Sequence, residues 1–194
     1  MHKRMKSLMI NPILLCCVCG CVSNEQPDNS TPSPTKETAS IDFSQPEKLR
    51  EWGFYFANQS DAQALQIADS LTFNFGTAFR GDAFFIKGLY AINKRELSWA
   101  LQQLDSSLKY NPMNADVHME RGILLYDLDA VESSILAFNK IMDMDRQNPE
   151  VYYWLGQCFL KKRDTASAKD FIIEATRLEP TNSGYRNLLN RLNQ

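Results

Sequence analysis

Three glycines, Gly88, Gly122 and Gly156, recur at a constant spacing of 34 residues, and this period constrains the fold more than any other feature of the chain. Other small or apolar residues recur at fixed distances of 12, 16 and 19 positions after each glycine: Ala100, Ser134 and Ala168, then Leu104, Phe138 and Ile172, then Ser107, Ile141 and Ala175. A fixed period of this length predicts a stack of helix pairs, because one pair cannot bury its apolar side alone.

The residue types at these positions fit helices that pack closely. Glycine, alanine and serine allow two helices of one unit to approach, because the side chains at a contact set the distance between helix axes. Pro112 and Pro180 lie where the second helix of a unit must end, whereas the middle unit has Arg146 there and a proline three positions later. Asp164 and Thr165 precede an alanine-rich run and predict the start of a second helix.

The third unit carries the pattern most completely. It reads Tyr152-Tyr153-Trp154-Leu155-Gly156-Gln157-Cys158-Phe159, followed by Ala168, Ile172, Ala175 and Pro180. This pattern resembles the tetratricopeptide repeat, and the resemblance extends over residues 81–182, with Lys87 and Arg121 departing from it before the first two glycines. The resemblance implies an all-α fold, a short superhelix of helix pairs, which we expect to follow a signal peptide and a disordered tether.

We divide the chain on this basis into seven segments. They are a lipoprotein signal peptide (1–20), a lipidated cysteine with a disordered linker (21–45), a degenerate repeat or N-terminal helical cap (46–80), three repeats (81–114, 115–148 and 149–182) and a C-terminal capping helix (183–194). An alternative for residues 46–80 is that they pack on the inner surface of the repeats.

The N-terminal segment has the build of an export signal. Lys3, Arg4 and Lys6 precede a short apolar run that is too brief to span a bilayer. The run ends in Val18-Cys19-Gly20-Cys21, which resembles the bacterial lipobox. The resemblance implies cleavage after Gly20 and a lipid on Cys21. Alternatives are a secreted protein that is cleaved elsewhere and a cytosolic protein with an apolar N-terminus.

The charge balance indicates what the repeats do not bind. Removal of Lys3, Arg4 and Lys6 from the 21 basic residues leaves 18 against 23 acidic ones, a formal charge of −5. Nucleic-acid binding needs clustered lysine and arginine, so we expect no nucleic-acid partner. The three consecutive basic residues at 161–163 are interpreted as a solvated turn.

The composition of the mature segment also argues against catalysis. His118 is its single histidine, Cys158 its single cysteine after Cys21, and no nucleophile elbow or phosphate-binding glycine loop is present. We interpret His118 and Cys158 as packing residues. We therefore expect no catalytic residues, no metal and no cofactor.

The inner surface of the repeats is the candidate binding site. In the tetratricopeptide repeat family the first helix of each unit lines a concave groove. The resemblance therefore implies that the residues at the same positions of this chain bind a partner: Phe85, Leu89, Met119, Ile123, Tyr126, Tyr153 and Gln157. An apolar and aromatic groove suits a protein or peptide segment. The set lacks the lysine and asparagine of repeats that clamp a C-terminal carboxylate. Alternatively, residues 46–80 or a second copy of the chain, in a homo-oligomer, cover this surface.

These inferences combine into one functional hypothesis. The chain is expected to be a scaffold of the bacterial cell envelope, anchored by a lipid on Cys21 and holding a protein partner. Val22 is not the aspartate that retains some lipoproteins at the inner membrane, so we expect the outer membrane. The alternatives are a structural accessory subunit of an outer-membrane assembly or a type IV pilus system, similar to a pilotin with a permanently occupied groove, and an unrecognised enzyme.

Overall fold

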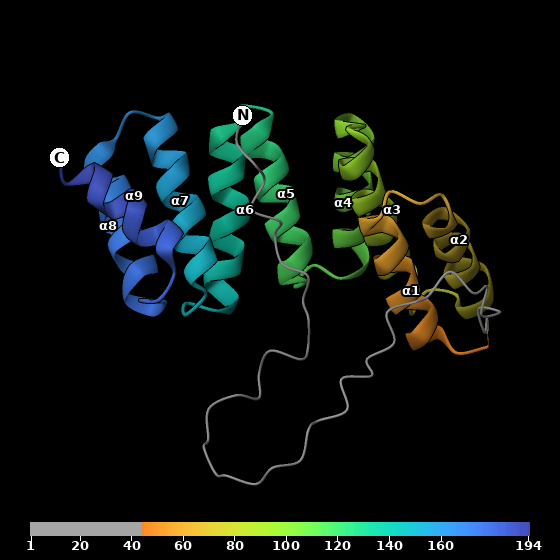
Figure 1. The fold of residues 1–194 in the computed structure, drawn as a ribbon. Helices are drawn as coiled ribbons and strands as arrows, with labels where there is room; N and C mark the ends of the chain where they lie inside the picture. The colour runs from red at the N-terminus through yellow and green to blue at the C-terminus, as the bar shows by residue number, and fades with distance from the viewer. Residues whose placement is uncertain (1–43) are drawn as a thin grey trace, which may run out of the picture. The chain divides into compact units, whose positions relative to one another are not determined.

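Every regular element in residues 44–194, the part of the chain that the computed structural model describes, is an α-helix (Figure 1). The helices are α1 (Pro46–Asn58), α2 (Gln63–Phe75), α3 (Arg80–Lys94), α4 (Leu97–Tyr110), α5 (Ala115–Asp127), α6 (Val131–Met144), α7 (Pro149–Lys161), α8 (Thr165–Leu178) and α9 (Ser183–Leu192). The predicted all-α architecture is confirmed for these residues. The predicted signal peptide, Cys21 and the linker up to residue 43 lie outside them.

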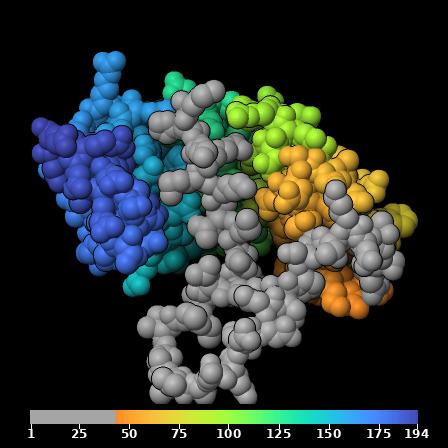
Figure 2. Space-filling view, viewed as in Figure 1, coloured from red at the N-terminus to blue at the C-terminus, as the bar shows by residue number. Residues whose placement is uncertain are grey.

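The helices pack in consecutive pairs, α1 with α2, α3 with α4, α5 with α6 and α7 with α8. Each pair contacts the next one, and α9 packs against α8 at the C-terminal end. In Figures 1 and 2 the colours accordingly run in chain order across the helices, from orange at α1 to dark blue at α9. The first helices of the successive pairs are neighbours in the stack: α3 contacts α5, and α5 contacts α7.

Side chains before the helices satisfy the free backbone N–H groups of their first turns. Asn114, Asn148, Asp164 and Asn182 each accept a hydrogen bond from the turn that follows. Asp164 Oδ1 accepts from the Ser167 N–H at 3.0 Å, so the start of α8 predicted from Asp164 and Thr165 is confirmed. Pro149 occupies the first turn of α7, where the missing N–H has no cost.

The turn inside each pair repeats one backbone device that the sequence pattern does not reveal. A residue with left-handed φ ends the first helix in all four pairs: Ser60 (58°), Arg95 (66°), Asp129 (64°) and Arg163 (61°). The following N–H then reaches back to a carbonyl in the last turn, as Asp164 does to Phe159 at 3.0 Å. This geometry caps a helix C-terminus without a glycine.

The core is divided into three clusters along the stack. The first contains Leu49, Ile67 and Leu71 from the first pair with Ile86 of α3. The second centres on Leu104 and the third on Phe138, each with apolar residues from the next pair, as expected for repeats that bury apolar surface against their neighbours. At the C-terminal end Tyr185 and Leu188 of α9 are buried.

Helices α1 and α2 both pack against α3. On the side of α1, the Arg50 guanidinium lies 3.7 Å from the Asp82 carboxylate, and the Phe54 and Phe85 rings meet edge to face at 5.3 Å. Asn93 Nδ2 of α3 donates to the carbonyl of Ala57 at 3.1 Å. These contacts place α1 alongside α3 from its first turn, at Asp82, to its last, at Asn93.

Candidate partner-binding face

The structure separates the predicted partner-binding residues by exposure. Phe85 on α3 and Met119 on α5 are each 7% exposed, so they offer little surface to a partner. The others are partly buried and keep some accessible surface: Leu89 on α3, Ile123 and Tyr126 on α5, and Tyr153 and Gln157 on α7. A contact surface on these helices therefore depends on the second group.

Four aromatic rings form a continuous series from α5 across α7 to α9, which we call the aromatic row: Tyr126, Trp154, Tyr153 and Tyr185. The Tyr126 and Trp154 ring centroids are 5.6 Å apart, and those of Trp154 and Tyr153 are 5.7 Å apart, both edge to face. Tyr153 and Tyr185 follow at 5.1 Å with their planes tilted by 31°. The row thus joins the last two repeats to the C-terminal helix.

Trp154 fixes the aromatic row to the core. Its ring stacks on Phe138 of α6 at 6.2 Å with an interplanar angle of 12°, and Phe138 is fully buried. The indole Nε1–H donates to Glu150 Oε1 one helical turn earlier at 3.4 Å. Held on both sides, Trp154 gives the row a rigid centre, which lowers the entropic cost of binding.

Carboxylates gather at one end of the row, and we call Asp116, Glu150 and Glu179 the acidic end. Burial raises the pKa of Glu150, and the charges of Glu179 and Asp116 raise it further, whereas the Trp154 hydrogen bond lowers it. Loss of hydration also raises the pKa of Asp116, although its side chain still contacts solvent. Burial, Glu179, Glu150 and Tyr153 raise the pKa of the Tyr185 hydroxyl, in that order.

The repeat register explains why these carboxylates lack a cation. Asp82 lies six residues before its glycine, as do Asp116 and Glu150, and its partner Arg50 lies three residues before the preceding glycine, Gly53. Phe85 and Met119 occupy the equivalent places ahead of the other two acids. An apolar residue at each of these two places means that neither repeat supplies a cation at the position from which Arg50 reaches Asp82.

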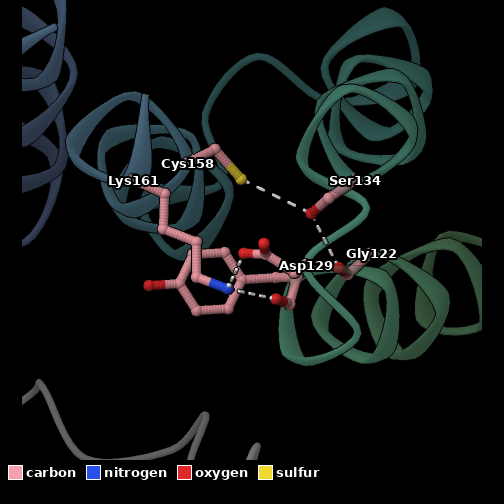
Figure 3. A network of polar contacts seen from close by, with 6 residues as sticks. Gly122, Asp129, Ser134, Cys158 and Lys161 are labelled. Atoms are coloured by element: carbon pink, nitrogen blue, oxygen red, sulfur yellow. Dashed lines mark hydrogen bonds and ion pairs between the residues drawn. The ribbon is translucent and has the colours of Figure 1, made fainter. Parts of the chain in front are cut away.

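A lysine closes the opposite end of the row. Lys161, at the end of α7, donates from Nζ to the Tyr126 carbonyl at 2.6 Å and to Asp129 Oδ1 at 3.1 Å. Its Nζ also lies 4.0 Å from the centroid of the Tyr126 ring. Figure 3 shows Lys161 reaching across to the segment that carries Asp129, so it ties α7 to the end of α5.

Beside this lysine, a buried hydroxyl links the same two repeats (Figure 3). Ser134 Oγ of α6 donates to the Gly122 carbonyl of α5 at 2.7 Å and lies 3.4 Å from Cys158 Sγ of α7. Burial raises the pKa of the Cys158 thiol. A fully buried and protonated thiol packs between helices, in agreement with the interpretation of Cys158 as a packing residue.

The comparisons with known proteins agree with this architecture. A sequence profile of the tetratricopeptide repeat family matches residues 132–192. Among solved structures, MamA from Desulfovibrio magneticus RS-1 superposes with a TM-score of 0.66 at 15% identity, over 76% of this chain and 83% of that one. The TPR domain of Arabidopsis OM64 superposes with a TM-score of 0.57 at 21% identity, over 60% of this chain and 97% of that one. The described part of the chain has the tetratricopeptide repeat fold, and residues 132–192 match that family.

Two further similarities bear on this repeat protein. The first TPR of Spaghetti (RPAP3), bound to the HSP90 peptide SRMEEVD, superposes with a TM-score of 0.56 at 18% identity, over 59% of this chain and 90% of that one. A BBSome complex member BBS4 homolog of Drosophila melanogaster is 28% identical over 88 residues, 45% of this chain. The matched part spans only 18% of that protein.

Residues 44–194 contain no group of three or more histidine, cysteine, aspartate or glutamate side chains that could hold a metal ion. His118 Nε2 lies 2.9 Å from the carbonyl of Pro112, in the loop before α5. None of the helices in residues 44–194 combines the length and apolar character needed to cross a bilayer.

Sequence reasoning did not assign Trp154, Tyr185 or Lys161 to the candidate face. The sequence pattern marks Trp154 as a repeat-motif residue and places Tyr185 in the capping helix and Lys161 in a solvated turn. The cap must pack on the last repeat, whose first helix carries Tyr153, so a tyrosine in each segment could have indicated their contact. Lys161 lies 34 residues after Asp127, at the same repeat position, but nothing in the sequence indicates which carbonyl it meets.

Proposed function

We propose that this tetratricopeptide repeat protein is a non-catalytic scaffold that binds a protein or peptide partner through the aromatic row. The tetratricopeptide fold supports a protein–protein interaction scaffold. One observation carries the assignment to this face: Tyr126, Tyr153 and Trp154 remain partly exposed although Trp154 is fixed by Phe138. Rigid and partly exposed tyrosine and tryptophan rings are the side chains that contribute most to protein interfaces.

We further propose that the protein is a lipoprotein of the bacterial envelope, with its lipid on Cys21 and the repeats at the outer membrane. The basic start, the apolar run and the cysteine that follows Gly20 support this assignment. A flexible linker up to residue 45 would give the repeats a reach of roughly 25–30 Å from the lipid surface. Confinement near the membrane would raise their effective concentration toward membrane partners to about the millimolar range.

A second candidate function concerns a permanent complex. Several apolar side chains are exposed on α2, α6 and the loop after α4, among them Phe73 at 90% and Leu136 and Met113 at 67%. Such residues would suit a structural accessory subunit of an outer-membrane assembly or a pilotin-like subunit of a type IV pilus system, whose partner never leaves. This function predicts one constant companion at constant stoichiometry after detergent extraction.

A site-specific crosslinking experiment tests the binding face. A photoreactive phenylalanine analogue at Tyr153 is expected to crosslink a defined protein in intact cells, whereas the same analogue at Phe73 on α2 serves as an exposed control outside the aromatic row. Tyr153→Ala is expected to weaken capture of that protein by about 1–2 kcal/mol while the helical circular dichroism is unchanged. Equal crosslinking from both sites, or unchanged capture by Tyr153→Ala, would refute the assignment of the face.

The anchor is tested separately. Cys21→Ser is expected to give an unprocessed precursor or a protein released from the membrane fraction, because the thiol is the site of the lipid. A processed variant that still sediments with outer membranes would contradict the lipoprotein assignment and leave the binding face untouched.

A further inference from the structure

We propose that the acidic end of the aromatic row accepts a lysine or arginine side chain, so that the partner segment is both cationic and apolar. This inference rests on the proposed function and specifies the chemistry of the partner. The binding residues are Glu150 for the charge and the ring of Tyr153, which rests on the buried Tyr185, for the side-chain stem, with Asp116 and Glu179 adding negative potential.

The first step of the argument is the charge that the fold leaves uncompensated. Glu150 makes one long hydrogen bond, to Trp154, and the charges acting on it come from two other carboxylates, Glu179 and Asp116. A half-buried carboxylate surrounded by like charges is costly until an opposite charge approaches. Arg50 provides that charge for the equivalent acid of the first repeat, Asp82, at 3.7 Å. The last repeat has the acid without the cation.

The second step is the aromatic surface beside the carboxylate. Tyr153 is partly exposed three residues after Glu150 on α7, and its ring rests on the buried Tyr185 ring with centroids 5.1 Å apart. The face of a tyrosine ring attracts cations. The same row already binds one cation, because Lys161 Nζ lies 4.0 Å over the Tyr126 ring. Lysine packs its apolar stem along such rings while its charge reaches the nearest acceptor.

The third step concerns the sign of the charge that the partner carries. Lys161 at the other end of the row is already occupied by Asp129 and the Tyr126 carbonyl, so it adds little attraction for an anionic segment. An acidic peptide would bring more negative charge to Glu150 and Glu179 and would be rejected. The face therefore favours the opposite charge to that of the acidic peptide bound by the first TPR of Spaghetti.

A library of short random peptides displayed on phage tests the inference with the full-length protein. The selected peptides are expected to be enriched in lysine and arginine next to aromatic or aliphatic residues. A synthetic peptide from the selection should bind Glu150→Gln about tenfold more weakly than the wild type, a change that corresponds to the loss of one charge-assisted contact. Glu150→Lys should abolish binding, and raised salt should weaken it.

Glu132→Gln is the matched control, because Glu132 is also a first-turn acid but lies on α6 and pairs with Lys162 at 3.3 Å. It should leave peptide affinity unchanged. Peptides with no basic bias whose binding depends on Tyr153 but not on Glu150 would overturn this inference and preserve the proposed function. Failure to select any peptide, or selection of peptides insensitive to Tyr153→Ala, would count against the proposed function itself.

Discussion

Gly122→Ala should destabilise the protein although alanine is a better helix former than glycine. A Cβ at this position would lie 2.5, 2.7 and 2.9 Å from three ring carbons of Phe138, a fully buried side chain that also stacks on Trp154. Forcing a methyl into such a core costs about 2–3 kcal/mol, and the gain in helix propensity offsets about 1 kcal/mol. The net loss is about 1–2 kcal/mol, or roughly 3–6 °C in Tm for a domain of this size.

Gly88→Ala provides the comparison within the same fold. Its Cβ would meet Leu104 Cδ2 at 2.9 Å and Cγ at 3.2 Å, so the overlap is smaller than at Gly122 and this side chain has to shift less. We expect this variant to lie within about 0.5 kcal/mol of the wild type, because the propensity gain and the repacking cost nearly cancel. Urea unfolding followed by circular dichroism measures both variants. The reasoning fails if Gly122→Ala is as stable as Gly88→Ala.

Three further perturbations address the links around the aromatic row. Lys161→Met should cost about 1 kcal/mol in urea unfolding, because it removes a partly exposed ion pair and the contact with Tyr126, and an unchanged midpoint would show that the lysine does not tie the repeats. Ser134→Ala should cost about 1 kcal/mol through the lost hydrogen bond to Gly122, and equal stability would argue against that bond. Burial and neighbouring carboxylates raise the pKa of Glu150, so the native state holds its proton more tightly than the unfolded state and stability rises as pH falls. Glu150→Gln should therefore be more stable than the wild type near neutral pH, with the difference vanishing in acid, whereas a constant difference across the titration would contradict the shift.

The fold could be predicted from the sequence because its strongest constraints are periodic. Gly122 and Gly156 lie where their Cβ atoms would collide with Phe138 and Ile172, so the spacing of small and bulky residues directly records the contact inside each pair. The left-handed residues that end the first helices could not be predicted in this way. Arg95 and Arg163 have left-handed φ although arginine ordinarily favours a helix. The position of the following helix, and not the preference of the residue, therefore fixes their backbone conformation.

The candidate face was predictable only in part. The repeat positions indicated Tyr126 and Tyr153 as surface residues, and both keep accessible surface on neighbouring helices. The same reasoning named Phe85 and Met119, which are nearly covered. Phe85 packs against Phe54 of the preceding pair, and Met119 belongs to a cluster formed with the following repeat. Whether a position is open therefore depends on side chains of the adjacent repeats, and a single repeat does not contain that information.

The three acids that precede the repeat glycines show the consequence for function. Asp82, Asp116 and Glu150 occupy the same position of successive units, yet Asp82 alone has a cation from the unit before it. In a stacked repeat protein each residue is surrounded partly by its own unit and partly by the adjacent one. The chemistry of a face therefore depends on which residue of one repeat lies opposite which residue of the repeat before it. Asp82 follows a repeat that carries Arg50 and forms an internal ion pair. Glu150 follows a repeat that carries Met119 at that position and is left to be neutralised by another molecule.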